Sequence, residues 1–206
     1  HFLALHHLEG LIKFNNIKTI LDVGAGTGRV ALYLKRDNPK LQIISVEPVK
    51  ELRAVGHAKG LTESELVDGD IYSLGFADSS FDLVCAFGVF HHLDKPFLAL
   101  KEMQRISAHS IFISDTNNFG QGSHLARFIK QLINLIGLWK TAIYVKTQGK
   151  NYTISEGDGL AYSFSIFNLV SYLKRNWSLY FLSTVPSQTS LFRTATHLAL
   201  FAKKKK

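Results

Sequence analysis

The sequence predicts a doubly wound α/β fold, and three observations lead to that prediction. Short, almost continuously apolar segments recur through the first 116 residues, as is typical of parallel strands covered on both faces. Segments with helical spacing alternate with them, which favours strand–helix–strand units. Two more strand-like segments near the C-terminus are separated by only about ten residues, too few for a helical crossover, so they predict an antiparallel hairpin at one edge.

The expected strands follow one another in a simple order along the chain. The first five lie at residues 18–24, 41–47, 65–70, 81–87 and 110–116, of which 65–70 is the weakest. The terminal pair lies at residues 178–185 and 196–204. Helices are expected at residues 2–14, 27–37, 95–106 and 164–176. The first of these should cover the first strand, and the third separates apolar Phe97 and Leu98 from polar Lys101 and Arg105.

Residues 117–163 are longer than a normal connection between a strand and a helix. Apolar residues recur within this segment at helical spacing, at Leu125, Phe128, Ile129, Leu132, Ile133 and Ile136. Arg127, Lys130 and Gln131 lie on the opposite face. Three interpretations stand: a helix packed on the domain surface, a lid over a pocket, or an amphipathic helix on a membrane.

Composition and charge limit the classes of function. A chain of 206 residues suits one domain. Lys203 to Lys206 supply four of the eight net positive charges, so the folded part is only mildly basic and a nucleic-acid partner is not expected. Cys85 is the single cysteine, which excludes a disulfide framework and favours a reducing compartment. No apolar stretch reaches the ~18 residues of a membrane span and no secretory signal is visible in a sequence that begins at His1, so the expected location is cytoplasmic.

A glycine-rich loop, "LDVGAGTGR" (21–29), follows the first strand and opens the first crossover helix. Gly24, Gly26 and Gly28 have the spacing G-x-G-x-G, which differs from the dinucleotide fingerprint and disfavours a nicotinamide dehydrogenase. Glycines allow a tight turn and the close approach of a ligand to the backbone. The N–H groups at the start of the helix favour an anionic group such as a carboxylate.

Acidic residues follow the next two strands. Glu47 ends the second strand, 19 residues after Gly28, where a carboxylate can accept both hydroxyl protons of a ribose. Asp70 follows the third strand, where it can accept from an exocyclic adenine amine, and Ile71 can cover the ring face. Since ligands bind at the carboxyl edge of such sheets, these positions predict one nucleoside site.

These motifs together resemble those of class I S-adenosylmethionine-dependent methyltransferases. The resemblance covers residues 17–116, through "LDVGAGTG", "VEP", "GDIYSL" and "SFDLVCAFGVFHHL", and points to the small-molecule group with quinone-biosynthesis and sugar O-methyltransferases. It implies S-adenosylmethionine as cofactor. The implied contacts are Asp22, Gly24, Ala25, Gly26 and Thr27 around the methionine part, Glu47 on the ribose, Pro48, Asp70 and Ile71 around the adenine, and Phe87 and Gly88 beside the sulfonium.

The same resemblance implies a Rossmann-like, mostly parallel, seven-stranded sheet with an antiparallel last strand. We therefore expect residues 1–206 to be a single methyltransferase domain, with 117–163 as a lid or substrate-binding insertion. Two departures from the family pattern stand out. "SAHS" (107–110) replaces a Gly-Gly turn before the fifth strand, and 117–163 carries no motif that identifies a substrate.

The stretch "GVFHHLDKP" (88–96) places His91 and His92 directly after the fourth strand, near the expected cofactor edge. Asp115 ends the neighbouring fifth strand. We hypothesise that His92, oriented by Asp115, deprotonates a hydroxyl acceptor, because an imidazole titrates near neutral pH. A packing or helix-capping role for the pair is the open alternative. Metal binding is disfavoured, because adjacent histidines on an extended chain point apart and no second cluster has ligand spacing.

The sequence thus predicts methyl transfer from S-adenosylmethionine to a small molecule, most readily to a hydroxyl oxygen. Polar residues for substrate contact lie in "NYTISEGDGLAYSF" (151–164), at Tyr152, Glu156, Asp158 and Tyr162. Membrane-surface contact through 123–139 is a further possibility. The alternatives are an RNA or protein methyltransferase that uses the basic face, and a cofactor-binding protein without catalysis.

Overall fold

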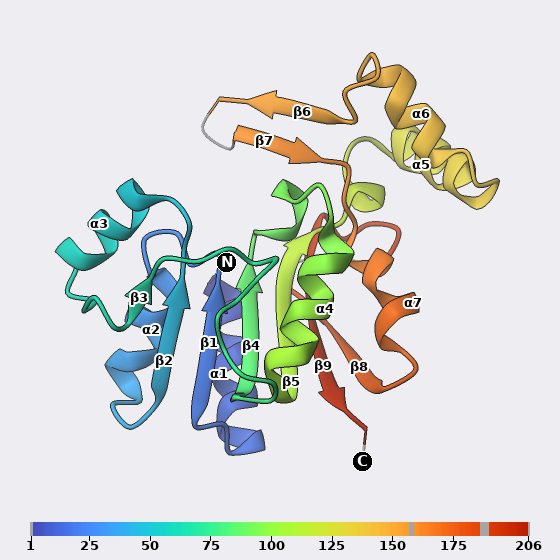
Figure 1. Ribbon diagram of the computed structural model, residues 1–206. Helices are drawn as coiled ribbons and strands as arrows, with labels where there is room; N and C mark the ends of the chain where they lie inside the picture. The colour runs from blue at the N-terminus through green and yellow to red at the C-terminus, as the bar shows by residue number, and fades with distance from the viewer. Residues whose placement is uncertain (1, 157–158, 186–189, 206) are drawn as a thin grey trace.

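The computed structural model describes residues 2–156, 159–185 and 190–205. Its main sheet contains β1 Thr19–Val23, β2 Gln42–Val46, β3 Leu66–Val67, β4 Phe81–Phe87, β5 Ser107–Thr116, β8 Trp177–Ser183 and β9 His197–Lys204. The strand order is β3-β2-β1-β4-β5-β9-β8 (Figure 1). Strands β1 to β5 pair in parallel, and β9 runs antiparallel to both β5 and β8. The predicted α/β class and the terminal hairpin are confirmed.

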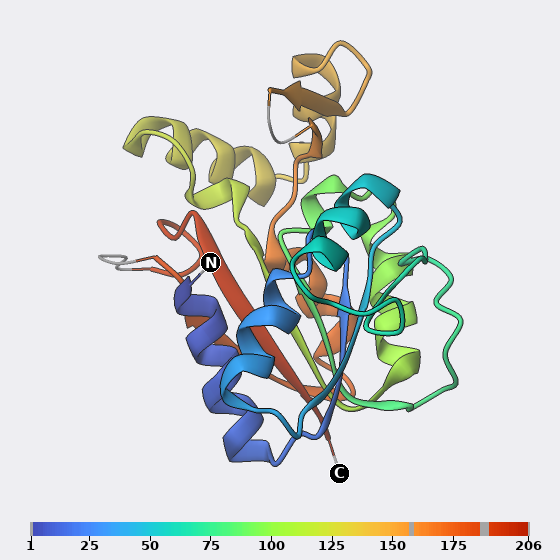
Figure 2. The ribbon, with the colours of Figure 1, turned by 90° about the vertical axis from the view of Figure 1, so that its left-hand side faces the viewer.

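Helices cover both faces of this sheet (Figures 1 and 2). They are α1 Phe2–Asn15, α2 Arg29–Asp37, α3 Lys50–Ala58, α4 Pro96–Ile106 and α7 Val170–Leu173. Short 3-10 helices lie at Phe90–His92, Asn118–Gly120 and Ile166–Leu169. One buried cluster joins α1 and α2 to one face of the sheet, and a second joins α4 and α7 to the other face. Both faces are therefore dry, as the continuous apolar strands predict.

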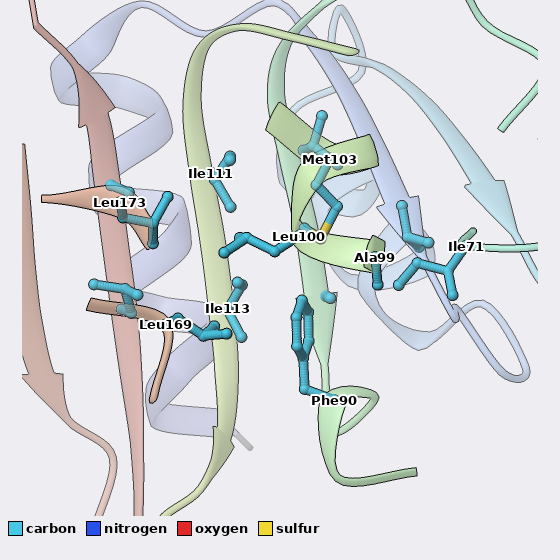
Figure 3. Close-up of a cluster of buried hydrophobic side chains, with 14 of the residues drawn as sticks. Ile71, Phe90, Ala99, Leu100, Met103, Ile111, Ile113, Leu169 and Leu173 are labelled. Atoms are coloured by element: carbon cyan, nitrogen blue, oxygen red, sulfur yellow. The ribbon is translucent and has the colours of Figure 1, made fainter. Parts of the chain in front are cut away.

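The side chains of β4 show how the two layers form. Val84 and Ala86 belong to the cluster under α4, whereas Leu83 and Cys85 belong to the cluster under α1 and α2, because successive residues of a strand face opposite ways. Leu100 of α4 lies within the cluster under α4, close to the β5 residues Ile111 and Ile113 (Figure 3).

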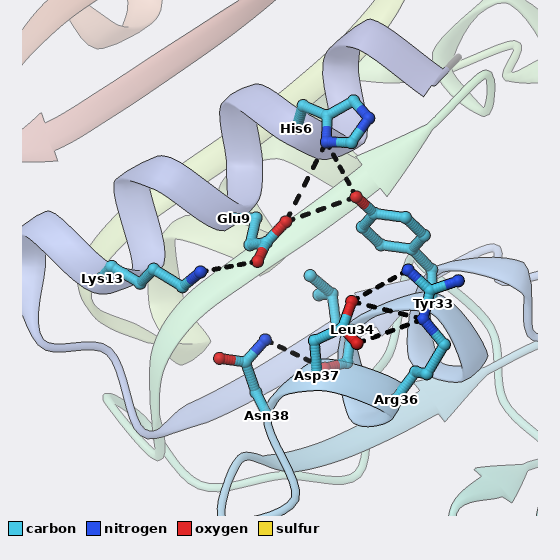
Figure 4. A network of polar contacts seen from close by, with 8 residues as sticks. All are labelled: His6, Glu9, Lys13, Tyr33, Leu34, Arg36, Asp37 and Asn38. Carbon is cyan, nitrogen blue, oxygen red and sulfur yellow. Dashed lines mark hydrogen bonds and ion pairs between the residues drawn. The ribbon is translucent and has the colours of Figure 1, made fainter.

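Polar contacts also link α1 to α2, the helix that follows the glycine loop (Figure 4). The Tyr33 hydroxyl lies 2.9 Å from His6 Nδ1 and donates to Glu9 at 3.3 Å. Lys13 donates to the other Glu9 oxygen at 2.7 Å. Such exposed contacts stabilise weakly, so the buried apolar contacts between these elements hold α2 in place and the polar network sets its orientation.

Two local predictions need correction. The helix expected at 164–176 is shorter, because Asn117 forms an isolated bridge with Ser165 that keeps this stretch extended. Helical structure begins at Ile166, where Ser165 and Asn168 form a capping box. The 107–110 stretch is not a turn before the fifth strand, since β5 already begins at Ser107 and absorbs the irregularity as a register shift against β4.

Residues 117–163 stand beyond the carboxyl ends of the parallel strands (Figure 1). They form α5 His124–Leu135, α6 Trp139–Lys146 and a separate hairpin of β6 Tyr152–Ser155 and β7 Gly159–Tyr162. None of the residues of α5 is buried, and the helix contacts the domain through Lys130 and Gln131, which donate to backbone oxygens beside it. Within the described part of the chain, no helix is both long and apolar enough to cross a bilayer.

Candidate active site

A cavity of about 830 Å³ opens at the carboxyl ends of β1, β2 and β4. All of the predicted cofactor positions line it: Asp22, Gly24, Ala25, Gly26, Thr27, Glu47, Pro48, Asp70, Ile71, Phe87 and Gly88. This is the edge at which doubly wound sheets bind their ligands. Residues from four separate strand ends therefore meet at one hollow, as the sequence predicts.

The glycine loop has a backbone that other residues would strain. Gly24, Gly26 and Gly28 all have φ between +57° and +74°, a region that L side chains rarely adopt. A Cβ at Gly24 would lie 2.6 Å from the Val89 side chain, and one at Gly28 would lie 2.1 Å from Leu61. At Gly26 a Cβ would meet nothing within 4 Å, so the backbone there leaves open space beside the cavity.

Glu47 fixes the same loop from the end of β2. This residue is 5% exposed, and its two carboxylate oxygens accept from the backbone N–H groups of Gly26 at 2.8 Å and Val49 at 3.0 Å. Each carboxylate oxygen has a second lone pair. The carboxylate can thus hold the loop and still accept from the two hydroxyls of a ribose.

Asp22 carries an unsatisfied buried oxygen in the cavity wall. The residue is 1% exposed; Oδ1 accepts from Cys85 Sγ at 3.6 Å, and Oδ2 has no partner among the described residues. Burial raises the pKa of Asp22 to about 7, partly opposed by the Cys85 contact and Arg29. A buried carboxylate of this kind needs a cationic or hydrogen-bonding partner. The α-ammonium group of S-adenosylmethionine fits that requirement, and the glycine loop and Glu47 fit its remaining parts.

The side of the cavity around Asp70, where the resemblance places the adenine, is more open. Asp70 is exposed and accepts from the Tyr72 backbone N–H at 2.9 Å, while Ile71 is 8% exposed. The Tyr72 hydroxyl donates to Asp94 at 2.8 Å, and burial raises the pKa of Tyr72 to about 12. The cavity also has lining residues that the sequence did not single out: Arg29, Val49, Leu52, Tyr72, Val89 and Leu93. These residues lie close in sequence to the predicted motifs, and that closeness is the signal by which the sequence could have identified them.

The predicted pairing of His92 with Asp115 is wrong, because the structure pairs Asp115 with His91. His91 Nδ1 lies 2.8 Å from Asp115 Oδ1. Asp115 is fully buried, and it also accepts from the backbone N–H groups of Phe90 at 2.8 Å and Thr116 at 2.6 Å. A carboxylate with these three donors ties the 3-10 helix after β4 to the end of β5.

His92 instead faces the cofactor cavity. It lines the 830 Å³ cavity, and its Nδ1 lies 2.7 Å from the backbone oxygen of Leu160 in β7. The two histidine rings are 3.9 Å apart. Side chains in a 3-10 helix diverge by about 120° per residue, so adjacent histidines reach different partners. A carbonyl only accepts, which places the proton of a neutral His92 ring on Nδ1 and its lone pair on Nε2.

Two more cavities lie between the sheet edge and the 117–163 segment. The larger, of about 810 Å³, is mostly apolar and shares Leu93 with the cofactor cavity. The smaller, of about 350 Å³, includes His91 and Tyr152, and Tyr162 lines both. Of the other residues predicted to contact substrate, Glu156 is exposed and Asp158 lies outside the described residues.

Metal chemistry has no candidate centre in the parts of the chain that the structure describes. No group of three or more His, Cys, Asp or Glu side chains within 2–156, 159–185 and 190–205 is arranged to hold an ion. The histidine pair is instead engaged by a carboxylate and a backbone carbonyl.

The similarities of this chain to known proteins agree with the site that the structure shows. Residues 21–110 match a family model described as a methyltransferase domain. The chain is 35% identical over 97 residues to a demethylmenaquinone methyltransferase of Thermotoga maritima, covering 47% of this chain and 42% of that protein. It is 34% identical over 98 residues to an uncharacterized methyltransferase of Schizosaccharomyces pombe, covering 43% of this chain and 35% of that protein. The chain thus spans less than half the length of these relatives.

The fold extends further than the sequence similarity. A solved structure of a protein from Pyrococcus horikoshii OT3 aligns with 98% of this chain and 88% of its own, with a TM-score of 0.67 and 14% identity. The fold and the cavity agree with the resemblance to class I S-adenosylmethionine-dependent methyltransferases. Residues 21–110 match the methyltransferase-domain model, and S-adenosylmethionine is the cofactor of that class.

Proposed function

We propose that the protein transfers a methyl group from S-adenosylmethionine to a hydroxyl oxygen of a small molecule. When bound, the cofactor supplies a methyl group already activated by a sulfonium charge. The chain's own contribution is then to hold the acceptor in line and to take up its proton. The observation that carries the proposal is the position of His92, which lines the cofactor cavity beside Leu93, where the apolar cavity begins.

His92 is the residue proposed to take the hydroxyl proton. The Leu160 carbonyl holds Nδ1–H and thereby leaves the basic lone pair on Nε2. Asp115 does not orient this ring, since it binds His91. His91 and Asp115 are therefore proposed as positioning residues that fix the 3-10 helix, and His92 as the base.

The 117–163 segment is proposed as the lid over the acceptor. Its β7 strand reaches the cofactor site through Leu160, and its α6 helix forms part of the walls of both further cavities. A largely apolar cavity of about 810 Å³ is large enough for a small aromatic or prenylated molecule. The single buried cysteine agrees with a reducing compartment, and a cytoplasmic location is part of the proposal.

Turnover can be tested with a panel of simple phenols, naphthoquinols, alcohols and amines, by measuring formation of S-adenosylhomocysteine. With a hydroxyl acceptor, His92→Ala should lower kcat by roughly 10²–10⁴-fold, with unchanged affinity for S-adenosylhomocysteine. His109→Ala is the matched control, because that side chain is exposed on β5. Wild-type turnover by His92→Ala would sink the assignment of the base.

A ring carbon of a quinol is the second candidate acceptor. It is favoured by the names of the relatives, a demethylmenaquinone methyltransferase of Thermotoga maritima and a ubiquinone/menaquinone C-methyltransferase of Bdellovibrio bacteriovorus. The apolar cavity suits the ring system of a quinol equally well. Mass spectrometry and NMR of the methylated product from a naphthoquinol would distinguish an ether from a carbon-methylated ring.

We further propose that α5 brings the lid to an anionic membrane surface. Leu125, Phe128 and Leu135 are 68%, 63% and 82% exposed. Arg127, Lys140 and Lys150 lie in the same segment outside the smaller cavity, and residues 117–155 contain no aspartate or glutamate. An exposed apolar face with a cationic surround suits an anionic interface, whereas two copies of this surface would repel each other.

Vesicle co-sedimentation tests this contact. The protein should bind phosphatidylcholine vesicles containing phosphatidylglycerol more strongly than vesicles of phosphatidylcholine alone. Phe128→Asp should abolish the binding, and Leu3→Asp, an exposed position on α1, should not. Equal sedimentation of wild type and Phe128→Asp would overturn the proposal.

A further inference from the structure

The smaller cavity beneath the 117–163 segment has a charge pattern that methyl transfer alone does not require. This cavity, of about 350 Å³, is enclosed by the end of β5, by α5 and α6, and by the β6–β7 hairpin. Its described lining residues are His91, Thr116, Asn118, Gln121, Lys130, Trp139, Ile143, Lys146, Thr147, Asn151, Tyr152, Thr153, Ala161, Tyr162, Ser163 and Phe164. This lining includes two lysines and several hydroxyl groups but no carboxylate.

Lys130 is held in place within this wall. Its Nζ donates to the backbone oxygens of Asn118 and of Gln121, the latter at 2.7 Å. An ammonium has three N–H donors, so one donor remains beyond these two bonds. Burial lowers the pKa of Lys130, and the nearby charges of Lys146 and Arg127 lower it further. The side chain is thus a positioned cation among other cations.

Two buried polar atoms in the same wall add to this pattern. The indole N–H of Trp139 and Oδ1 of Asn118 are both inaccessible to solvent and have no hydrogen-bond partner among the described residues. The Trp139 ring lies against Phe119, with centroids 5.2 Å apart, which fixes the direction of its N–H group. Buried polar groups in native proteins are generally paired, so the wall holds one donor that lacks an acceptor and one acceptor that lacks a donor.

We propose that this cavity binds an anionic group of the methyl acceptor, a carboxylate or a phosphate. Lys130 and Lys146 would hold the anion, while the apolar part of the same molecule fills the 810 Å³ cavity. The two cavities are neighbours, because Trp139 and Tyr162 line both, and one molecule would lie across them. This inference deepens the proposed function, on which it rests for the identity of the ligand as the acceptor.

Other ligands satisfy the wall less well. A metal ion would be repelled by the two ammonium groups, and a neutral group would leave their charges unpaired. Asp115, the buried carboxylate behind His91, is not among the described residues that line the cavity, and its ion pair is with His91 rather than with either lysine. An anion supplies both the charge and the lone pairs that the wall requires.

Calorimetry with the intact chain tests the charge of the ligand without any turnover. The probes are phenyl phosphate, benzoate and their neutral counterpart phenol. At least one anionic probe should bind about tenfold or more tighter than phenol, and the pair shows whether the site prefers a phosphate or a carboxylate. Lys130→Met and Lys146→Met should each weaken that probe by at least about tenfold. Lys130→Arg should retain most of its affinity, which separates loss of charge from misfolding.

Lys150→Met is the matched control, since Lys150 is an exposed lysine of the same segment outside the cavity lining. It should leave the affinity for the anionic probe unchanged. Equal affinity for phenol and both anionic probes, or wild-type binding by Lys130→Met, would overturn the anion site. Binding of S-adenosylhomocysteine is measured on the same samples. If the protein did not bind S-adenosylhomocysteine, the proposed function would be refuted. If it bound S-adenosylhomocysteine but showed no preference for the anionic probes, only this inference would be refuted.

Discussion

The seven-stranded sheet and the 117–163 segment use their apolar residues in opposite ways. Leu100 of α4 is 1% exposed and packs between the helix and the sheet, whereas Leu132 of α5 is 48% exposed. The family model also covers the sheet region, residues 21–110, and stops before the segment. The comparison teaches that the proposed cofactor half of the site is built on a buried frame, while the proposed acceptor half is built on a surface element.

This division suits a methyltransferase. A cofactor shared by the class requires strand ends and a glycine loop held in fixed positions, which a dry two-layer core provides. Acceptor recognition can change with little effect on that core when it lies on an exposed segment. The contact between His92 and the Leu160 carbonyl is one place where the two halves meet.

We call the seven-stranded sheet and its covering helices the frame. The largest effect on the stability of the frame should come from Asp115. Asp115→Ala removes a fully buried carboxylate that binds His91 and the backbone N–H groups of Phe90 and Thr116. We expect the free energy of unfolding to fall by about 3–5 kcal/mol, because buried donors lose their partner. Urea denaturation measures this loss. Asp37→Ala, at an exposed ion pair, is the control and should unfold like the wild type.

The next largest effect on stability should come from the truncation of a core side chain. Leu100→Ala leaves a cavity beneath α4 and should cost about 2–5 kcal/mol of unfolding free energy. The same denaturation experiment gives the value. A cost below about 1 kcal/mol would show that the frame is not tightly packed around this residue.

The affinity for the cofactor should depend on pH through Asp22. Burial raises the pKa of this carboxyl to about 7, so it is mostly protonated at pH 6 and mostly ionised at pH 8. A bound ammonium group favours the ionised form, and binding below pH 7 therefore releases a proton. Affinity for S-adenosylhomocysteine should rise about tenfold from pH 6 to pH 8, and Asp22→Asn should remove the dependence. A wild-type affinity that falls with pH would contradict the assignment.

The smallest effect should come from the matched truncation in the segment. Leu132→Ala changes the same side chain as Leu100→Ala, but on an exposed helix face, and should cost within about 0.5 kcal/mol. Circular dichroism and denaturation would show this. A loss comparable to that of Leu100→Ala would mean that α5 packs against a surface in solution, and would break the division between frame and segment.

Much of the frame can be predicted from the sequence for physical reasons. Almost continuously apolar stretches such as 81–87 predict buried strands, and successive strand ends bring Glu47 and Asp70 to the glycine loop. The cofactor cavity was therefore predictable in location and lining. The terminal hairpin followed from the short connection before β9.

The remaining details depend on the directions of individual side chains, which the sequence pattern does not encode. Whether His91 or His92 reaches Asp115 is decided by a single 3-10 turn, and the sequence of two adjacent histidines is the same in either case. The β6–β7 hairpin lacks the alternation of a half-buried strand, because much of it is exposed. The cavities beneath the segment are lined by residues distant in sequence, such as Phe97 and Tyr162.

The central claim is that the cavity at the ends of β1, β2 and β4 holds the cofactor through the loop fixed by Glu47. Calorimetry with S-adenosylhomocysteine on the intact chain tests it directly. One molecule should bind per chain, and Glu47→Ala should weaken binding by at least about tenfold, because two backbone N–H groups lose a charged acceptor. Glu51→Ala, at an exposed position on α3, should bind like the wild type. Absence of binding to the wild type, or unchanged binding by Glu47→Ala, would contradict the account.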